Sequence, residues 1–243
     1  MKKLSLVAAL LLSVGTSQAA DLELGIFELN RGQFIKAIAE FEPLVAEGYA
    51  PAQYQMAMVY QNGWGKRKDP KKAVELMTQA AEQNYPDALF ALSVMYSEGK
   101  LVPQDLEKAF SLMKKAADKE LATAMFNVAV MYANGEGVPK NSAQAVKWYE
   151  KAARKSYVLA QFNLALMHYE GQGVEQSIEQ SYIWNYVAAK SGYVPAEKSR
   201  DMDVRKLPQD QVREITEKAE ALYKQIQDQI KLKVRAAEAS SLY

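Results

Sequence analysis

The sequence has no cysteine, a single histidine and almost no net charge, and each shortage excludes a class of protein. Without cysteine, disulfides cannot hold the fold, and His168 alone cannot supply the imidazole and thiolate ligands of a typical zinc site. A catalytic triad would also have only one possible base. The 30 basic and 29 acidic residues nearly cancel, so no overall field attracts nucleic acid. We therefore expect no metal, no cofactor and no nucleic-acid partner.

Long apolar runs are also scarce, and the one at the N-terminus is short. Two lysines precede an apolar segment from Leu4 to Val14, and small residues follow at Ser17 and Ala19. This is the pattern of a secretory signal peptide, whereas a membrane-spanning helix needs about 20 apolar residues. The sequence predicts a signal peptide over residues 1–19, cut near Ala19. The mature protein is then expected without an integral membrane segment, in the periplasm or, alternatively, secreted.

A repeat with a period of 36 residues dominates the rest of the chain. The recurring residues are an alanine, a glycine and an alanine pair, at Ala52, Ala88, Ala124, Ala160 and Ala196; Gly63, Gly99, Gly135 and Gly171; and Ala80-Ala81, Ala116-Ala117, Ala152-Ala153 and Ala188-Ala189. Between these marks the apolar residues recur at helical spacing and not in the alternation of a strand. Each period therefore predicts two helices.

The expected ends of these helices carry the residues that helix ends favour. The first helix of each period ends at the recurring glycine, which adopts a positive φ without steric cost. The second helix begins after a side chain that caps helix N-termini: Asp69, Asp105, Asn141 or Ser177. The Gly-x-Gly pairs at Gly63, Gly135 and Gly171 follow helices rather than strands, so they are interpreted as turns and not as phosphate-binding loops.

The period predicts an all-α fold, a right-handed α/α superhelical solenoid of about five 36-residue helix-turn-helix repeats with a C-terminal capping helix. After the signal peptide, the expected segments are an N-terminal partial repeat, four repeats and a terminal half-repeat with its capping helix: 20–51, 52–87, 88–123, 124–159, 160–194 and 195–243. In the terminal segments, helices are expected over 22–30, 33–47 and about 195–205, and the capping helix is expected to open at Leu207-Pro208.

The stretch from Ala124 to Ala153 carries a pattern of small, tyrosine, glycine and Trp-Tyr positions that is specific because many positions agree in phase. At these residues the chain resembles the Sel-one-like repeat family, the 36-residue relatives of the tetratricopeptide repeat, over about residues 33 to 200. Members of that family are scaffolds and adaptors, in bacteria often in the envelope. The resemblance therefore implies a protein or peptide partner.

Three departures from the family pattern carry expectations of their own. Leu101 replaces a loop glycine, so this loop is expected to differ in shape from its equivalents. His168 replaces a core tyrosine and is interpreted as a packing residue. A basic loop, residues 64–68, replaces the usual Gly-Val-Pro turn.

The resemblance places the binding surface on the concave face, which the first helix of each repeat lines. Candidate partner-binding residues there are aromatic, amide or acidic: Tyr54, Gln55, Phe90, Glu98, Phe126, Asn127, Asn134, Phe162, Asn163 and Glu170. An amide offers donors and an acceptor, so Asn127 and Asn163 are suited to hold the backbone of an extended peptide, as asparagines do in related tetratricopeptide domains. The alternative is that the aromatic residues pack between helices and the asparagines only cap or solvate them.

These observations favour an exported, non-enzymatic adaptor that binds proteins or peptides through the concave face. Two alternatives remain open. One is an envelope hydrolase acting on peptidoglycan or β-lactams, although no convergent set of catalytic groups is visible. The other is a broad-specificity periplasmic chaperone. The identity of the partner and the oligomeric state stay open at this stage.

Overall fold

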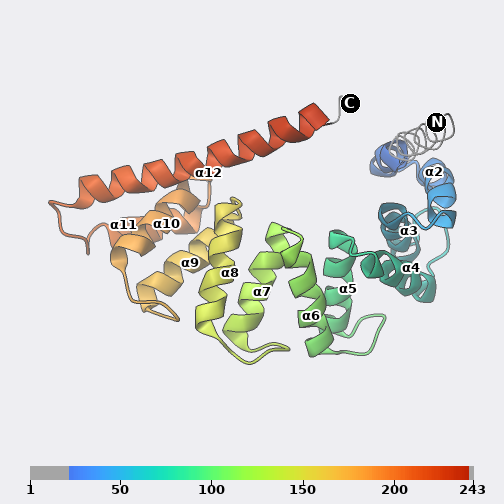
Figure 1. Cartoon of the computed structure of the whole chain (residues 1–243), viewed down its shortest axis with the longest axis horizontal. Coiled ribbons are helices and arrows are strands. Elements are labelled where there is room, and N and C mark those ends of the chain that lie inside the picture. The colour runs from blue at the N-terminus through green and yellow to red at the C-terminus, as the bar shows by residue number, and fades with distance from the viewer. Residues whose placement is uncertain (1–21, 241–243) are drawn as a thin grey trace, which may run out of the picture. The chain divides into compact units, whose positions relative to one another are not determined.

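The computed structural model describes residues 22–240, and every regular element in that part of the chain is an α-helix (Figure 1). The chain divides into two compact units, Met1–Ala116 and Ala117–Tyr243. In the first unit, residues 22–30 are helical, and the helices that follow are α2 (Phe34–Ala46), α3 (Ala50–Asn62), α4 (Pro70–Glu82), α5 (Pro86–Glu98) and α6 (Leu106–Asp118), which ends just beyond the division. The helices of the second unit are α7 (Ala122–Asn134), α8 (Ser142–Arg154), α9 (Val158–Glu170), α10 (Ile178–Lys190), α11 (Val194–Asp203) and α12 (Val212–Ser240).

The helix ends lie where the sequence predicts them. The carboxylate of Asp69 accepts from the backbone N–H of Lys72 at 3.0 Å, and equivalent caps at Asp105, Asn141 and Ser177 begin α6, α8 and α10. Each cap satisfies an N–H group that a helix N-terminus leaves without an internal partner. At the other end, the first-type helices α3, α5, α7 and α9 each terminate at a glycine with a φ between 67° and 81°. The predicted helical hairpins are confirmed.

The recurring alanines form the tightly packed centre of each unit. All five that recur at the start of the first-type helices are fully buried: Ala52, Ala88, Ala124, Ala160 and Ala196. The first alanine of every recurring pair, on the second-type helices, is also 0% exposed. Because an alanine leaves room for close helix approach, these columns set how tightly consecutive helices stack. The all-α repeat fold expected from the period is confirmed.

At the start of the first unit, α2 packs against α3. The basic loop, residues 64–68, contacts α2 through one aromatic pair and one ion pair. The ring of Trp64 stacks on Phe34 with 5.9 Å between centroids and 6° between planes. Lys66 Nζ lies 2.7 Å from a carboxylate oxygen of Glu42. The loop that replaces the usual turn therefore fastens α2 to the first full repeat.

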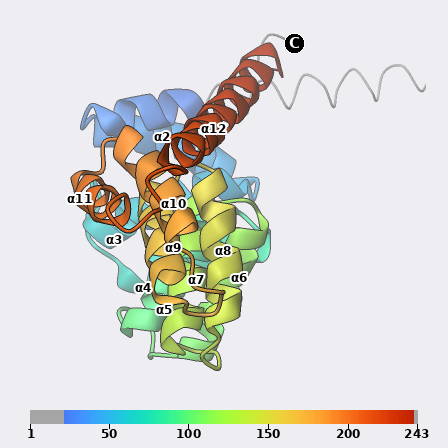
Figure 2. The ribbon, with the colours of Figure 1, turned by 90° about the vertical axis from the view of Figure 1, so that its left-hand side faces the viewer.

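At the end of the second unit, α12 covers α10 (Figure 2). Its apolar face supplies Ile215 and Ala219, which are buried with Tyr182 and Ile183 of α10 and with Leu207. The capping role predicted for this helix is confirmed. The helix begins at Val212 and not at Leu207-Pro208, because residues 204–211 form turns that place Leu207 in the apolar cluster.

The expectation that the Leu101 loop differs in shape is wrong. Leu101 has a φ of 67°, the same left-handed conformation as the equivalent glycines at Gly65, Gly137 and Gly173. The loop closes through a hydrogen bond from Asp105 N–H to Tyr96 carbonyl at 2.9 Å, and the other hairpins repeat this bond. The closure fixes the backbone, so the leucine accepts a conformation that costs about 1–2 kcal/mol.

The predicted signal peptide, residues 1–19, lies outside the described residues. Within them, none of the helices is both long and apolar enough to cross a membrane.

Candidate functional site

In the first unit, the first-type helices α3 and α5 form a groove of about 510 Å³. Tyr54 of α3 and Phe90 and Glu98 of α5, all predicted binding residues, line it together. Most of the remaining lining is apolar and includes Met58 and the strained Leu101. Gln55, predicted beside them, does not line this groove. The arrangement offers a mostly apolar groove whose lining also includes the paired charges of Glu98 and Lys100.

The aromatic column also has a packing role. Three of the four aromatic rings in the column contact the tyrosine that precedes the next first-type helix: Tyr54 with Tyr85 at 5.5 Å, Phe126 with Tyr157 at 5.1 Å, and Phe162 with Tyr193 at 5.2 Å between centroids. The next first-type helix after Phe90, α7, is preceded by Leu121 instead. Burial and the nearby Asp87 carboxylate raise the pKa of Tyr85 to about 12, so its phenol stays neutral. These pairs support the packing interpretation of the column without excluding contact with a partner on the outer edges of the rings.

The two predicted peptide-holding amides both bond back to their own helices. Asn127 Nδ2 donates to the Thr123 carbonyl at 2.8 Å, and Asn163 Nδ2 donates to the Leu159 carbonyl at 2.7 Å. An amide has two N–H donors and a carbonyl oxygen. The bond back to the helix therefore fixes each side chain in one orientation and leaves a donor and an acceptor for a ligand.

The residues near the ends of the first-type helices make contacts within their own loops. Each pairs with the side chain two positions later: Glu98 with Lys100 at 2.9 Å, Asn134 with Glu136 at 2.7 Å, and Glu170 with Gln172 at 2.7 Å. All three pairs are exposed, so solvent competes for them and their contribution to stability is small.

Comparison with known proteins supports the same fold from another direction. A family model described as the Sel1 repeat matches four consecutive segments, residues 50–85, 86–121, 122–157 and 158–193, which make up more than half of the chain. The chain belongs to the Sel1 repeat family. No curated protein matches the sequence.

Two solved structures share this fold. One is c5321, a protective antigen present in uropathogenic Escherichia coli strains that displays an SLR fold; it is 27% identical, with a TM-score of 0.69, over 86% of this chain and 45% of its own. The other is a Sel1 repeat protein from Oxalobacter formigenes, 23% identical with a TM-score of 0.69, over 85% of this chain and 84% of its own. This chain thus spans less than half of the E. coli protein. Sel1 repeat proteins are typically non-catalytic scaffolds for protein interaction.

The histidine that interrupts the Sel1 tyrosine column is half-buried. Its Nδ1 atom is buried with no hydrogen-bond partner among the described residues. Burial lowers the pKa of His168, against a smaller opposing effect of the Glu150 carboxylate. The imidazole is thus held neutral within the stack, which agrees with its interpretation as a packing residue.

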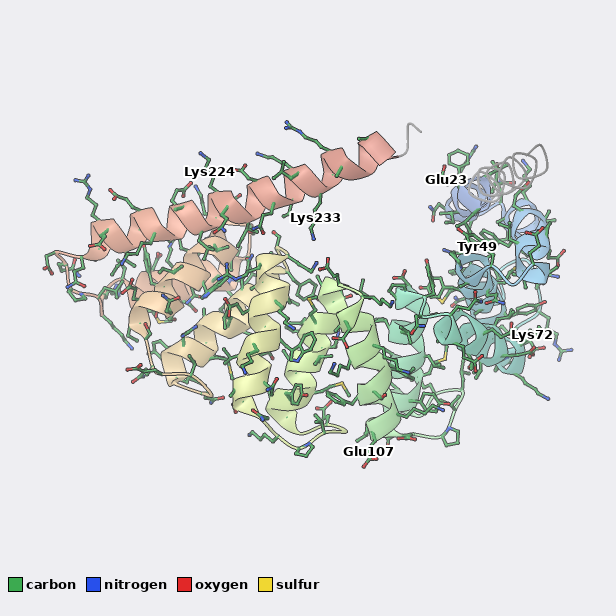
Figure 3. The ribbon with its side chains drawn as sticks, viewed as in Figure 1. Glu23, Tyr49, Lys72, Glu107, Lys224 and Lys233 are labelled. Carbon is green, nitrogen blue, oxygen red and sulfur yellow. The ribbon has the colours of Figure 1, made fainter. Side chains whose placement is uncertain are left out.

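A further hollow of about 650 Å³ lies between α12 and the α7–α8 hairpin of the second unit. Trp148 lines it, with Lys151 Nζ 4.0 Å from the centre of a Trp148 ring. Glu120 bonds to Lys155 and to Lys233, and in Figure 3 Lys233 points from α12 toward the hairpin while Lys224 points away. Both lysines lower the pKa of the Glu120 carboxyl through these hydrogen bonds. The sequence pattern does not show this hollow, because it depends on the path that α12 takes.

The sequence also did not predict a buried polar cluster at the end of the second unit. Ser181, Asn185 and Asp203 are each at most 3% exposed and bond to one another. A signal for it exists in the repeat, since each of the three stands at a position that is apolar in the earlier repeats. No group of three or more metal-binding side chains gathers here or elsewhere in residues 22–240.

Proposed function

We propose that this protein is an exported adaptor that binds an extended segment of a partner protein along the first-type helices of its Sel1 repeats. The groove between α3 and α5 carries the proposal, because Tyr54, Phe90 and Glu98 line it together and most of its other lining is apolar. Apolar walls with a few polar groups are typical of ligand grooves. An extended peptide has backbone donors and acceptors that amides on the same helix type, such as Asn127 and Asn163, are able to meet.

A photo-crosslinking amino acid placed in the groove tests the proposal in the full chain, expressed in its own cells. Position Phe90 lines the groove, and position Glu82, exposed on the second-type helix α4, serves as the matched control. We expect one recurrent crosslinked protein from position 90 and none of it from position 82. Many different proteins crosslinked at position 90 would favour the chaperone alternative. Equal crosslinking at both positions would contradict the proposal that the partner binds in the groove.

The amide part of the proposal is tested with the crosslinked partner in purified form. The double substitution Asn127→Ala and Asn163→Ala removes two groups worth about 1 kcal/mol each when they hydrogen-bond to a ligand. We expect the dissociation constant to rise by roughly tenfold or more, with helicity and melting temperature little changed. An unchanged dissociation constant would show that the two asparagines do not bind the partner and only cap or solvate their helices.

Export is proposed from the N-terminal sequence, and two measurements address it. Cell fractionation should place the full chain outside the cytoplasm and a variant lacking residues 1–19 inside it. N-terminal sequencing of the exported protein should begin at Ala20. Hydrolysis of a chromogenic β-lactam or of labelled peptidoglycan by the purified protein would favour the hydrolase alternative instead.

A further inference from the structure

The last repeat exchanges three apolar core positions for polar residues that meet in space. Counting back by 36 residues, the position of Ser181 is alanine in the three earlier repeats, that of Asn185 is methionine or tyrosine, and that of Asp203 is methionine or valine. The residues at these earlier positions are all buried: Ala73, Ala109 and Ala145; Met77, Met113 and Tyr149; and Val59, Met95, Met131 and Met167. Burial of polar groups in place of apolar ones lowers stability unless the groups are fully hydrogen-bonded. Such departures from the repeat are typical of functional sites.

The three polar residues form a hydrogen-bonded group between α10 and α11. Ser181 Oγ donates to Asp203 Oδ2 at 2.8 Å, and Asn185 Nδ2 donates to the same oxygen at 2.9 Å. Both donors are neutral, and no lysine or arginine among the described residues forms a salt bridge with the carboxylate, although the charge of Lys206 acts on it. Burial raises the pKa of Asp203, while the two hydrogen bonds and nearby Lys206 act against that rise. The group therefore has unused capacity for a cation.

A second acceptor lies in the same group. Asn185 is 3% exposed, and its Oδ1 atom is buried with no hydrogen-bond partner in the described part of the chain. A buried acceptor without a partner costs about 1–3 kcal/mol, so such atoms are rare in native proteins and call for an explanation. A carboxylate and an amide oxygen together make a site that accepts hydrogen bonds and favours a positively charged donor.

This group lines a pocket of about 150 Å³. Its other walls come from α9 and α11, namely Phe162, Leu166, Tyr169, Ser199 and Met202. Leu166 and Met202 are 43% and 56% exposed, so an apolar surface surrounds the polar floor. Lysine and arginine side chains match this arrangement, because each has an apolar stem that ends in a charged head. Phe162 is one of the predicted binding residues, so within the second unit the pocket includes a side chain that the sequence assigns to partner binding.

We propose that the pocket built by Ser181, Asn185 and Asp203 receives the cationic head of a lysine or arginine side chain from the bound partner. The head donates to Asp203 and Asn185, and the stem packs on Leu166 and Met202. The inference rests on the proposed function only in taking the cation to belong to a partner chain. Lys206 modulates the site: its ammonium group bonds to the Tyr169 hydroxyl and lies 4.4 Å from the centre of that ring, where it repels an entering cation.

The test uses small cations in place of the unidentified partner. The full mature protein, labelled with ¹⁵N, is titrated with n-butylguanidinium and n-butylammonium chloride, and n-butylurea serves as the neutral control of similar shape. We expect at least one cation to shift the Asn185 side-chain amide signals saturably at millimolar concentration, while n-butylurea leaves them in place. No saturable shift with either cation, or an equal shift with n-butylurea, would overturn the proposal.

Variants locate the binding. Asp203→Asn should weaken cation binding at least tenfold, and Asp201→Asn, at an exposed carboxylate on the same helix, should leave it unchanged. Lys206→Met should strengthen binding by removing a like charge. If Asp203→Asn does not fold, Asp203→Met restores the residue of the earlier repeats and provides the same comparison. Equal binding by the wild type and the Asp203 variant would reduce the cluster to a polar link between α10 and α11.

The small-molecule titration is independent of the crosslinking experiment. Failure of the cations to bind while position 90 still crosslinks one partner would remove this inference and leave the proposed function intact. Binding of the cations without any crosslinked partner would contradict the proposed function and leave the cation-binding pocket in place.

Discussion

At the residue scale, the positions that differ from the repeat carry the most information. His168 occupies a position that is tyrosine in the three earlier repeats, at Tyr60, Tyr96 and Tyr132. Its neutral form is favoured by burial, so protonation must act against folding. The folded-state pKa lies below the unfolded value of about 6.5. The stability due to the neutral imidazole is then present above that value and is lost as the pH falls through the folded pKa.

The substitution His168→Tyr should remove this pH dependence. Tyrosine restores the residue of the column and does not titrate between pH 5 and pH 8, so the free energy of unfolding should decline less for the variant than for the wild type as the pH falls from 7 to 5. At pH 7 the variant should be more stable by about 1 kcal/mol, because the buried unpaired Nδ1 is gone. Denaturant titrations at the two pH values measure both effects. Parallel losses in the two proteins would show that other groups cause the acid sensitivity.

Residue-level prediction succeeds where one local interaction decides the structure. The caps at Asp69 and Asn141 follow from the preference of short polar side chains for helix starts. It fails at Leu101. Leucine disfavours a positive φ, but the hydrogen bond that closes this loop, as in the neighbouring repeats, holds Leu101 in that conformation. The bonds from Asn127 and Asn163 to their own helices depend on side-chain rotamers, which the sequence pattern does not encode.

At the element scale, the loops between paired helices act as fixed spacers. Gly173, in the loop between α9 and α10, has a φ of 72°, and a Cβ atom there would lie 2.3 Å from the carbonyl carbon of Ser142 at the start of α8. This loop therefore sets the approach of one hairpin to the previous one. Gly32 is a matched case, since its φ is 73° and a Cβ atom would meet nothing within 4 Å.

Comparison of Gly173→Ala with Gly32→Ala separates backbone strain from close packing. Both variants incur the cost of a left-handed alanine, about 1–2 kcal/mol. Gly173→Ala should lose a further 1–3 kcal/mol, because the contact is with backbone that does not rotate away. The free energy of unfolding, measured by denaturant titration, should therefore fall clearly more for the Gly173 variant. A similar loss in both variants would show that the close approach of the loop to α8 has little energetic weight.

The helix pattern itself was predictable because the period aligns every signal. Alanine columns, caps and terminating glycines all agree at a spacing of 36 residues, so weak local preferences add up. The pattern gives no such support after residue 203, where the repeat ends. That is why the start of α12 was misplaced and the hollow beside Trp148 was not foreseen. The polar pocket was not predicted for a related reason, because its three polar residues depart from the repeat and therefore belong to no recurring pattern.

At the scale of the whole molecule, a repeat protein differs from a compact domain in how its stability is distributed. Each helical hairpin buries its apolar face against its chain neighbours, so stability is close to a sum of local terms. In the first unit, Phe41 of α2 is 0% exposed, and in the second unit, Ile215 of α12 is 2% exposed. Substitution by alanine at such sites costs about 3–5 kcal/mol for phenylalanine and about 2–5 kcal/mol for isoleucine.

Native-state hydrogen exchange should show that these losses remain local. Phe41→Ala should reduce the protection of amides in α2 and α3 and leave that of α9 and α10 nearly unchanged, and Ile215→Ala should do the reverse. The reason is that each substitution removes contacts between neighbouring hairpins only, while distant hairpins keep theirs. The double variant should reproduce the sum of the two exchange profiles. If either substitution instead lowered the protection of the slowest amides equally throughout residues 22–240, the chain would unfold as one cooperative unit, and the description of its stability as local terms would be wrong.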